Sequence, residues 1–427
     1  EAIQVHLRIG SLYDKYLQDD AAAEERYKIC LDIDASYMPA INALREMYIR
    51  HEDWQNLVRI LKQKVEFTRE LDEKAQINCE LGDVSLHNIG DNVNAYAYYN
   101  EALSLQPDCV GAAWPLAEKC VEDKAYARAL LMYEIVINGI AYTGDNSRLY
   151  EVNYKAGLCC QNLAQHARAL EFYRSSYELN PDNPPTLLGM GEELLEAKDY
   201  ETAYKMFQVL LERFSGELTP EQVIQIYHDS AVAKKATGEL ALARQLLERI
   251  LEADGPQTKS LELIIDVCDD MADWEAYVYY MSIHMERQED PDLKFSELMK
   301  IARVYGEKLN DPDRQIEMYY RALDVDPGSR IVLNELLTIY HATGQWENAI
   351  GIIERLCESE ESDDKIAKYY YTIAVIYRDE LNYDDKAVEF FNKTLDTNVG
   401  ELRAFEAIDR LLTASRNWED LEHNYKL

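Results

Sequence analysis

An aromatic residue returns along the chain at an almost constant interval, and this interval constrains the fold more than any other feature. The intervals are 72, 74, 74, 72 and 72 residues. The residues are Trp54, Tyr126, Tyr200, Trp274, Trp346 and Trp418. A chain of 427 residues would ordinarily suggest about three globular domains. A fixed period instead predicts an array of stacked supersecondary units, which lengthens by adding units.

The sequence around Trp346 indicates what one unit contains. An apolar stripe with helical spacing precedes the turn sequence HATGQ, and a second stripe follows it. The stripes consist of Leu333, Leu336, Leu337 and Tyr340, then Trp346, Ala349, Ile350, Ile353 and Leu356. This pattern predicts a helix, a tight turn and a second helix, with Gly344 placed to end the first helix. Because Trp346 has an equivalent in every second unit, we interpret it as a packing residue at the turn and not as a ligand contact.

Units of a second kind alternate with the aromatic ones. They carry one extra residue near the turn and tend to end in a proline element, as at Gln106-Pro107, Asn180-Pro181 and Asp326-Pro327. The sequence predicts about twelve units and 24 helices, with units starting near residues 1, 37, 74, 110, 148, 184, 222, 257, 295, 329, 365 and 401. We group them into six pairs of a single solenoid over residues 1–427: 1–73, 74–147, 148–221, 222–294, 295–364 and 365–427. We interpret the acidic or turn-rich joints at 68–74, 143–148, 215–222, 287–292 and 357–365 as solvated loops and not as linkers between domains.

The residues kept from unit to unit resemble those of the tetratricopeptide repeat. The best matches are Gly157, Ala169, Tyr173 and Pro181 in one unit, and Leu336, Tyr340, Gly344, Ala349 and Ile353 in another. The resemblance covers nearly the whole chain and implies an all-α fold, a right-handed α-solenoid superhelix of stacked helix-turn-helix repeats. Small residues are expected where the two helices of a unit approach each other, at Ala169, Ala203, Ala349 and Ala387.

The charge balance favours some partners over others. The chain has 79 acidic and 44 basic residues, which gives a formal net charge of -35. Such a surface repels nucleic acid and anionic lipid, so we expect neither nucleic acid nor membrane as a partner. A basic peptide or protein would be attracted. The alternative is that the acidic surface only keeps a long array in solution.

The cysteines and the apolar content bear on the compartment. The eight cysteines form no C-x-x-C pair, and most fall on apolar helix stripes, so we expect free, buried thiols in a reducing, cytoplasmic compartment. Because eight is an even number, disulfide pairing is the alternative. No apolar stretch of 18 residues and no signal peptide is visible. The last unit ends early, in LEHNYKL, and we expect the sequence to be part of a longer protein.

The sequence offers no pattern that predicts an enzyme, a metal site or a cofactor site. The eight histidines are scattered and none has zinc-site spacing. Gly189-Met190-Gly191 lies within a helical stripe and is interpreted as repeat packing, not as a phosphate loop. Asp266, Asp269 and Asp270 lack the order of a calcium loop, and the adjacent Cys159 and Cys160 are interpreted as packing residues.

The resemblance implies that first helices line a concave face and that the second, fifth and ninth places of each unit point into it. The fifth places hold Asn42, Trp114, Tyr154, Leu188, His228, Glu262, Asn334 and Tyr371. The ninth places of the aromatic units hold Glu46, Glu118, Glu192, Asp266, Thr338 and Arg410. We expect Trp114 to be the main anchor for a ligand, although it could equally pack on a neighbouring helix. The four successive acidic residues suggest a basic segment lying along the groove.

These expectations favour a non-catalytic scaffold for protein–protein interaction, which binds a peptide or protein on its concave face, and the charge balance favours a basic one. The alternative is a regulatory or scaffolding arm of a larger enzyme or complex. A third hypothesis is self-association through the exposed ends of the array. The Lys, Asn and Arg clamp with which some tetratricopeptide domains hold a C-terminal carboxylate is missing from the matching places.

Overall fold

The computed structural model describes residues 1–143, 146–255 and 257–425, and these residues form 24 α-helices and no strand. The all-α prediction and the predicted number of helices are confirmed. The first helices, with odd numbers, are α1 (Ala2–Leu12), α3 (Met38–Arg50), α5 (Leu71–Asp83), α7 (Val110–Glu122), α9 (Leu149–Asn162), α11 (Pro184–Glu196), α13 (Pro220–Ala236), α15 (Thr258–Asp270), α17 (Pro291–Glu307), α19 (Arg330–Thr343), α21 (Asp363–Asp379) and α23 (Leu402–Ala414). The second helices, with even numbers, are α2 (Asp20–Ile33), α4 (Trp54–Phe67), α6 (Asn92–Leu105), α8 (Tyr126–Thr143), α10 (His166–Leu179), α12 (Tyr200–Arg213), α14 (Leu240–Asp254), α16 (Trp274–Glu286), α18 (Pro312–Val325), α20 (Trp346–Glu358), α22 (Asp384–Thr397) and α24 (Trp418–Asn424).

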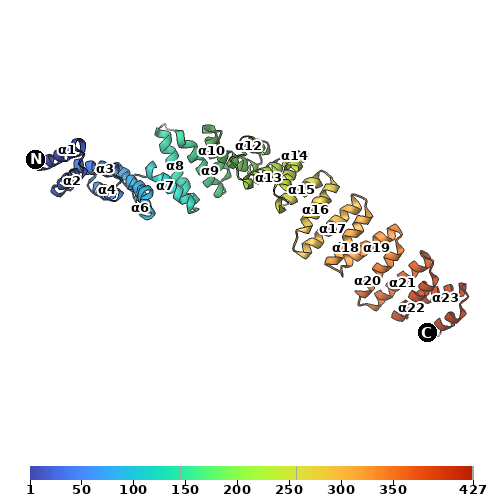
Figure 1. Cartoon of the computed structure of the whole chain (residues 1–427). Coiled ribbons are helices and arrows are strands. Elements are labelled where there is room, and N and C mark those ends of the chain that lie inside the picture. The colour runs from blue at the N-terminus through green and yellow to red at the C-terminus, as the bar shows by residue number, and fades with distance from the viewer. Residues whose placement is uncertain (144–145, 256, 426–427) are drawn as a thin grey trace. The chain divides into compact units, whose positions relative to one another are not determined.

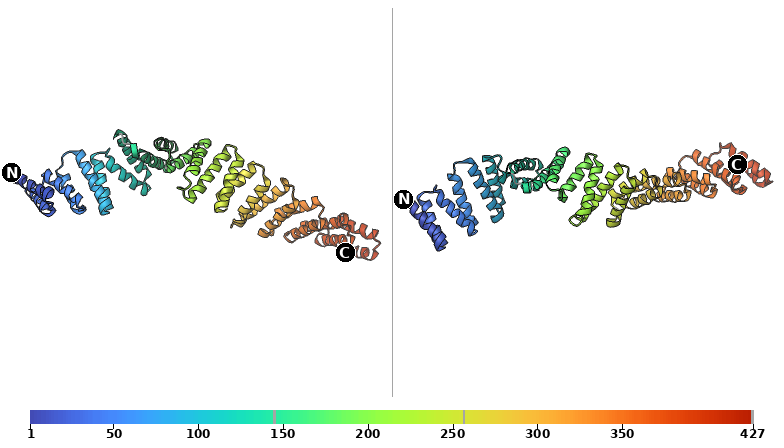
Figure 2. Two further views of the ribbon diagram at one scale, coloured as in Figure 1. Left: turned by 45° about the horizontal axis from the view of Figure 1, so that its top comes forward. Right: turned by 90° about the horizontal axis from the view of Figure 1, so that it is seen from above.

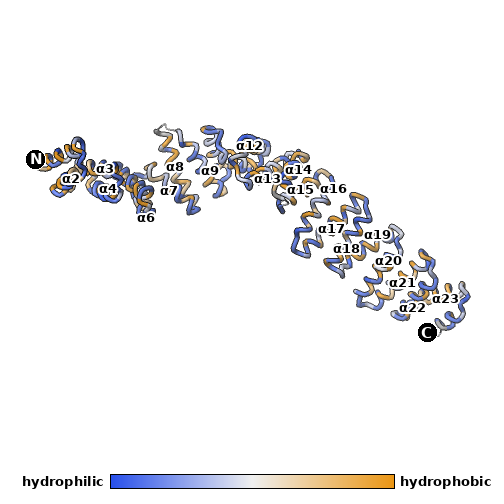
Figure 3. The backbone as a smooth tube through the Cα atoms, in the orientation of Figure 1, coloured by the Kyte–Doolittle hydropathy of each residue, from blue (hydrophilic) through white to orange (hydrophobic). Residues whose placement is uncertain are grey.

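The chain divides into two compact parts, each made of several repeats. From here on, unit 1 means the part Glu1–Glu239 and unit 2 means the part Leu240–Leu427. Within each unit, every helix packs against the next one in the chain, so that helical hairpins follow one another in order (Figures 1 and 2). Hydrophobic and hydrophilic residues alternate along the helices, as Figure 3 shows, which is the pattern of helices that bury one face. The interpretation of residues 1–427 as a single solenoid stays a prediction. The joint predicted at 143–148 includes residues 144–145, which lie outside the described residues.

The recurring aromatic residue is the first residue of a second helix in all six cases: α4, α8, α12, α16, α20 and α24. Trp346 is half-buried and packs against the core of its unit, with its ring 5.0 Å from that of His341 in an edge-on arrangement. The interpretation of Trp346 as a packing residue is therefore confirmed. Its equivalent Trp418, in the last helix, is 59% exposed.

Every turn between a first and a second helix contains one residue in the left-handed conformation. Its φ lies between +54° and +84°. Three of these residues are glycine, including Gly344, which ends α19 as predicted. The full set is Gln18, Glu52, Gly90, Lys124, Ala164, Lys198, Gly238, Ala272, Asn310, Gly344, Asn382 and Arg416.

The turns are of two lengths, and their distribution differs from the predicted alternation. In the shorter turn an N–H bonds to the carbonyl five residues earlier, as from Gln345 to Tyr340. In the longer turn the separation is six residues, as from Asp91 to Ser85, and the pairs of this kind are Tyr13–Asp19, Ser85–Asp91, Tyr305–Asp311 and Tyr377–Tyr383. The hairpin of α9 and α10 and the turn after α13 were expected to carry the extra residue, but both have the shorter turn. Their extra length lies before them, in the 18-residue helix α8 and in the loop between α12 and α13.

The small residues predicted at the crossing of the two helices are buried: Ala169, Ala203 and Ala387 are 0% exposed and Ala349 is 1% exposed. Some glycines of unit 1 allow an even closer approach of two helices, because an aromatic ring occupies the space where a side chain would be. A Cβ at Gly157 would lie 2.7 Å from the Tyr173 ring, and a Cβ at Gly189 would lie 2.5 Å from the same ring. Tyr173 thus packs tightly between α9 and α11. The interpretation of Gly189 as a packing residue is confirmed.

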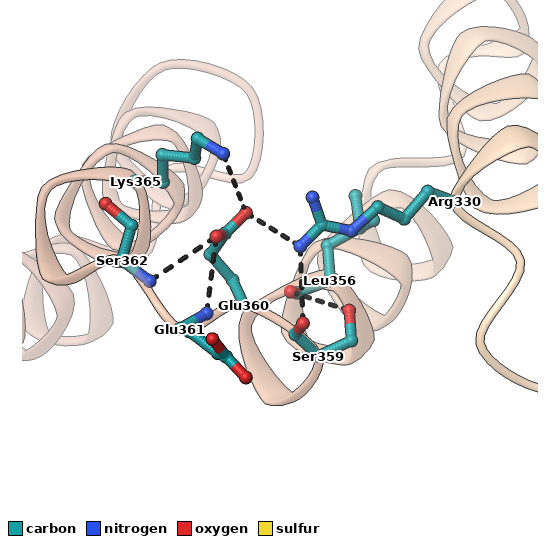
Figure 4. A network of polar contacts seen from close by, with 7 residues as sticks. All are labelled: Arg330, Leu356, Ser359, Glu360, Glu361, Ser362 and Lys365. Atoms are coloured by element: carbon teal, nitrogen blue, oxygen red, sulfur yellow. Dashed lines mark hydrogen bonds and ion pairs between the residues drawn. The ribbon is translucent and has the colours of Figure 1, made fainter.

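The joint at 357–365 is held by an ionic network and is not simply solvated (Figure 4). The Glu360 side chain is only 7% exposed, and its carboxylate lies 2.8 Å from Arg330 and 3.4 Å from Lys365. The backbone N–H groups of Glu361 and Ser362 also donate to it, at 3.3 and 3.4 Å. Desolvation raises the Glu360 pKa, but the bonds from Arg330, Lys365 and Ser362 outweigh it and lower the pKa. The prediction of a solvated loop was therefore wrong for Glu360.

Candidate functional site

The fifth and ninth places of unit 1 line clefts beside its first helices. Asn42 and Glu46, both exposed, line a cleft of about 420 Å³ that also involves Arg8, Asp14 and Tyr27, and we call it the α3 cleft. Trp114 and Glu118 line the α7 cleft, of about 780 Å³, together with His87, Tyr96 and Arg148. Tyr154, Leu188 and Glu192 line the α11 cleft, of about 580 Å³, with Gln161, Pro185 and Leu218. On α3, α7 and α11, the fifth and ninth places lie one helical turn apart and line the same cleft.

In the α7 cleft, Trp114 is half-buried and packs against the core of unit 1. The Arg148 guanidinium lies 4.3 Å from the centroid of its ring, in a cation–π contact. The Arg148 side chain is 65% exposed. Trp114 is thus both a packing residue and a surface of the cleft, and a flexible cation already covers its open face. Sequence reasoning missed Arg148, which lies just before α9.

Glu118 has a cationic partner from the next first helix. Its carboxylate lies 2.8 Å from Nζ of Lys155 and accepts a 3.0 Å hydrogen bond from the hydroxyl of Tyr133. Lys155 also pairs with Glu151, at 3.0 Å. Burial lowers the Lys155 pKa, but its bonds to the two carboxylates outweigh burial and raise the pKa. Glu118 therefore already has a cationic neighbour inside the fold, which it shares with Glu151.

The α11 cleft contains a carboxylate in a different state. Glu192 is half-buried and accepts a 2.6 Å hydrogen bond from Nε2 of Gln161, whose Oε1 accepts one from the Tyr173 hydroxyl, also at 2.6 Å. Burial raises the Glu192 pKa, and the charges of Asp229 and Glu193 raise it further. Within the described residues, no lysine or arginine forms an ion pair with Glu192. The ring of Tyr154 lies 6.1 Å from that of Tyr173 and forms an aromatic wall.

The predicted residues of unit 2 are arranged differently. Asp266, Asn334 and Thr338 are exposed, and the Thr338 hydroxyl donates to the carbonyl of Asn334 on its own helix. Tyr371 is half-buried, with its ring edge-on to Phe391 at 5.4 Å. None of the four lines the cleft of about 410 Å³ found in this unit, which involves Glu248, Leu251, Glu252, Leu261, Tyr279, Tyr280 and Ile283. This cleft lies mainly on second helices, which sequence reasoning did not consider for binding.

The described residues also bear on disulfides, metal sites and membrane-spanning helices. All eight cysteines are free, and all except the half-buried Cys79 are buried, which confirms the expectation of free thiols. No three His, Cys, Asp or Glu side chains in residues 1–143, 146–255 and 257–425 come close enough together to hold a metal ion. No helix in the same ranges is both long and apolar enough to cross a bilayer.

Comparison with known proteins finds one family model that matches parts of the chain. The model of the tetratricopeptide repeat matches residues 75–109, 150–183 and 367–398, which cover α5 with α6, α9 with α10, and α21 with α22. No curated protein matches the sequence.

Several solved structures resemble the chain. They include YrrB, described as a TPR protein with an unusual peptide-binding site (17% identity, 47% of this chain and 96% of that one, TM-score 0.38). A tetratricopeptide repeat protein from Parabacteroides merdae is similar at 12% identity, over 71% of this chain and 98% of that one, with a TM-score of 0.34. The APC/C hetero-tetramer Cut9-Hcn1 is similar at 14% identity, over 96% of this chain and 76% of that one, with a TM-score of 0.29. The three family matches fall on hairpins whose small and aromatic residues pack against each other, and these three hairpins are similar to tetratricopeptide repeats.

Proposed function

We propose that the chain is a non-catalytic scaffold and that the first helices of unit 1 bind an extended, basic segment of a partner protein. Arrays of tetratricopeptide repeats are in general protein–protein interaction scaffolds, and they use extended surfaces of this kind. The free thiols of the chain support a reducing compartment such as the cytoplasm.

The observation that carries the proposal is that Glu192 is half-buried and that its hydrogen-bond donor is a neutral amide. A half-buried carboxylate whose pKa is raised by burial is unfavourably placed while it is ionised and has no cation beside it. A lysine or arginine of a partner that enters the α11 cleft would supply that cation. The aromatic and apolar wall formed by Tyr154, Leu188 and Leu218 would pack against the stem of such a side chain.

The α7 cleft supports a second basic contact. The position of the Arg148 guanidinium, 4.3 Å from the Trp114 ring, marks where a cation is stable. Because Arg148 is exposed, an arginine of the partner could replace it over the ring at little cost. We expect Glu118 to add less, because Lys155 already lies 2.8 Å from its carboxylate. We therefore expect Glu192 and Trp114 to matter more for binding than Glu118 or the exposed Glu46, Asp266, Asn334 and Thr338.

Fluorescence anisotropy with labelled lysine- and arginine-containing peptides tests this proposal on the whole chain. The Glu192→Gln variant should weaken binding about tenfold, which corresponds to about 1.4 kcal/mol. Glu171→Gln, which removes the same charge from an exposed position on α10, is the matched control and should bind as the wild type does. Equal losses for the two variants would mean that only the net charge attracts the peptide. Equal binding of acidic and basic peptides would refute the proposal.

A further inference from the structure

Two thiols from neighbouring hairpins lie next to each other in unit 1. Cys79 is on α5, and Cys109 is the residue immediately before α7. Their Sγ atoms are 3.3 Å apart, and both cysteines are free. A disulfide bond is about 2.05 Å long, so the sulfurs need to approach by only roughly 1.3 Å to form one. Cys159 and Cys160 differ from this pair, because consecutive residues of a helix do not face each other.

The two thiols have different chemical characters. The two thiols share a hydrogen bond in which either sulfur can be the donor, and this bond lowers the Cys109 pKa, while burial raises it. The N–H groups of Ala112 and Gly111, in the first turn of α7, also bond to its sulfur and lower the pKa further, because a helix N-terminus favours the thiolate. The hydrogen bond to Cys109 raises the Cys79 pKa, and burial raises it further. The pair thus joins a thiolate-prone sulfur to a protonated thiol.

Access to the pair is from the side of Cys79. Cys109 is only 7% exposed, whereas Cys79 is half-buried. Gly111 lies beside Cys79, and a Cβ at this position would be in ordinary contact with the Cys79 sulfur, at 3.4 Å. Hydrogen peroxide, a small oxidant, would therefore approach Cys109 past the more exposed Cys79.

We propose that Cys79 and Cys109 are a redox-responsive pair that forms a disulfide between the third and fourth hairpins when a small peroxide is present. In the first step the Cys109 thiolate attacks one oxygen of hydrogen peroxide, which gives a sulfenic acid and hydroxide. In the second step the Cys79 sulfur attacks the sulfenic sulfur, the S–S bond forms and water leaves. Two thiols and one peroxide thus give one disulfide and two waters, and a dithiol reductant reverses the change.

The disulfide would join α5 to the start of α7 across 30 residues of sequence. A covalent link of this length restricts the unfolded chain and stabilises the two hairpins together. It would also fix the N-terminal end of α7, the helix that carries Trp114 and Glu118. Oxidation would therefore change the rigidity of the α7 cleft, although the formation of the bond does not depend on the proposed binding function.

The test is peroxide treatment of the reduced, whole chain, followed by thiol titration in denaturant and peptide mapping by mass spectrometry. The wild type should lose two of its eight thiols, and the map should show one linked pair of peptides that contain Cys79 and Cys109. The midpoint of thermal unfolding should rise by several degrees and return after dithiothreitol is added. The Cys79→Ser and Cys109→Ser variants should form no linked peptide, whereas the matched control Cys160→Ser should form it as the wild type does.

Two results would overturn the proposal. One is that the folded wild type keeps all eight thiols while peroxide oxidises a reference thiol in the same tube. The other is that the linked peptides contain different cysteines. If a serine variant does not fold by circular dichroism, Cys79→Ala replaces it. The peptide map of the wild type decides between the outcomes in either case.

Discussion

Unit 1 and unit 2 use the same hairpin but fill its interior in different ways. In unit 1, glycines of the first helices meet aromatic rings of the second helices: Gly10 meets Tyr27, Gly82 meets Tyr99, Gly157 meets Tyr173 and Gly191 meets Phe207. In unit 2, Gly306 meets the flexible side chain of Gln315, and Gly351 has nothing within 4 Å. A rigid ring packed against a glycine backbone cannot move aside for an added side chain. A flexible side chain such as Gln315 can move aside, and open space needs no movement.

The two units also treat buried carboxylates differently. Glu192 of unit 1 is half-buried with an amide partner, and its pKa is raised. Glu360 of unit 2 is held by Arg330 and Lys365, and its pKa is lowered. Glu360 thus has two cationic partners inside unit 2, whereas the hydrogen-bond donor beside Glu192 is a neutral amide. This difference is what separates a structural ion pair from a candidate binding residue.

The largest expected effect comes from adding a single carbon to the tight packing of unit 1. Gly157→Ala places a Cβ 2.7 Å from the Tyr173 ring and should lower the free energy of unfolding by about 1–3 kcal/mol. Gly351→Ala in unit 2 is the matched control, because the new Cβ has no atom within 4 Å. The substitution also replaces a conformationally flexible glycine inside a helix. It should raise the free energy by about 0.5–1 kcal/mol. Urea denaturation followed by circular dichroism measures both, and equal signs would remove the distinction between the units.

An exchange of turn residues should have a smaller effect. Ala164 of unit 1 has a φ of +55°, and a residue other than glycine pays roughly 1 kcal/mol in this region. Ala164→Gly should therefore stabilise its hairpin by about that amount, while Gly344→Ala, at a φ of +69°, should destabilise unit 2 by a similar amount. Hydrogen exchange of the peptides on either side of each turn gives the local effect. Changes of the same sign in both would show that side-chain contacts outweigh backbone strain there.

The smallest expected effect is a difference in how the stability around Glu360 and around Glu192 depends on pH. The Glu360 pKa is lowered below its ordinary value of 4.5, so its contribution to stability is complete above that value and is lost as the pH falls through the folded-state pKa. The Glu192 pKa is raised, so the cost of burying its charge disappears as the pH falls. Glu360→Gln should remove part of the acid-induced loss of protection in unit 2, measured by hydrogen exchange between pH about 6 and 3.

Glu192→Gln should instead increase protection around α11 at neutral pH. The two variants act as controls for each other, since each removes one carboxylate and the predicted effects have opposite signs. The same pH dependence in both would contradict the assignment of Glu360 as a paired charge and of Glu192 as an unpaired one.

Much of the fold could be predicted from the sequence because it depends on periodicity. The position of Trp346, the end of a helix at Gly344 and the packing role of Gly189 all follow from helical spacing and from the need for small residues at close contacts. The lengths of individual turns did not follow, because one extra residue can enter a turn, a helix or a loop without a change in the period.

The electrostatics of the candidate site could be predicted only in part. The ninth-place rule placed Glu118 and Glu192 beside clefts of unit 1 but could not distinguish them. The difference arises from Lys155, one residue after Tyr154, and from Gln161, whose partners depend on how each first helix is rotated against the next. A single sequence does not contain this rotation. Glu360 shows the same limit, because an acidic loop sequence does not reveal which arginine or lysine the fold brings to it.

The ring of Tyr173, which is held by Gly157 on one side and Gly189 on the other, has a mechanical consequence. Because two hairpins share one ring, a pulling force that separates one hairpin also breaks the packing of its neighbour. When unit 1 is stretched in an optical trap, the α9–α10 and α11–α12 hairpins should detach in one step, whereas hairpins that share no ring should yield one after another. The unit would then behave under load as a spring with one stiff segment.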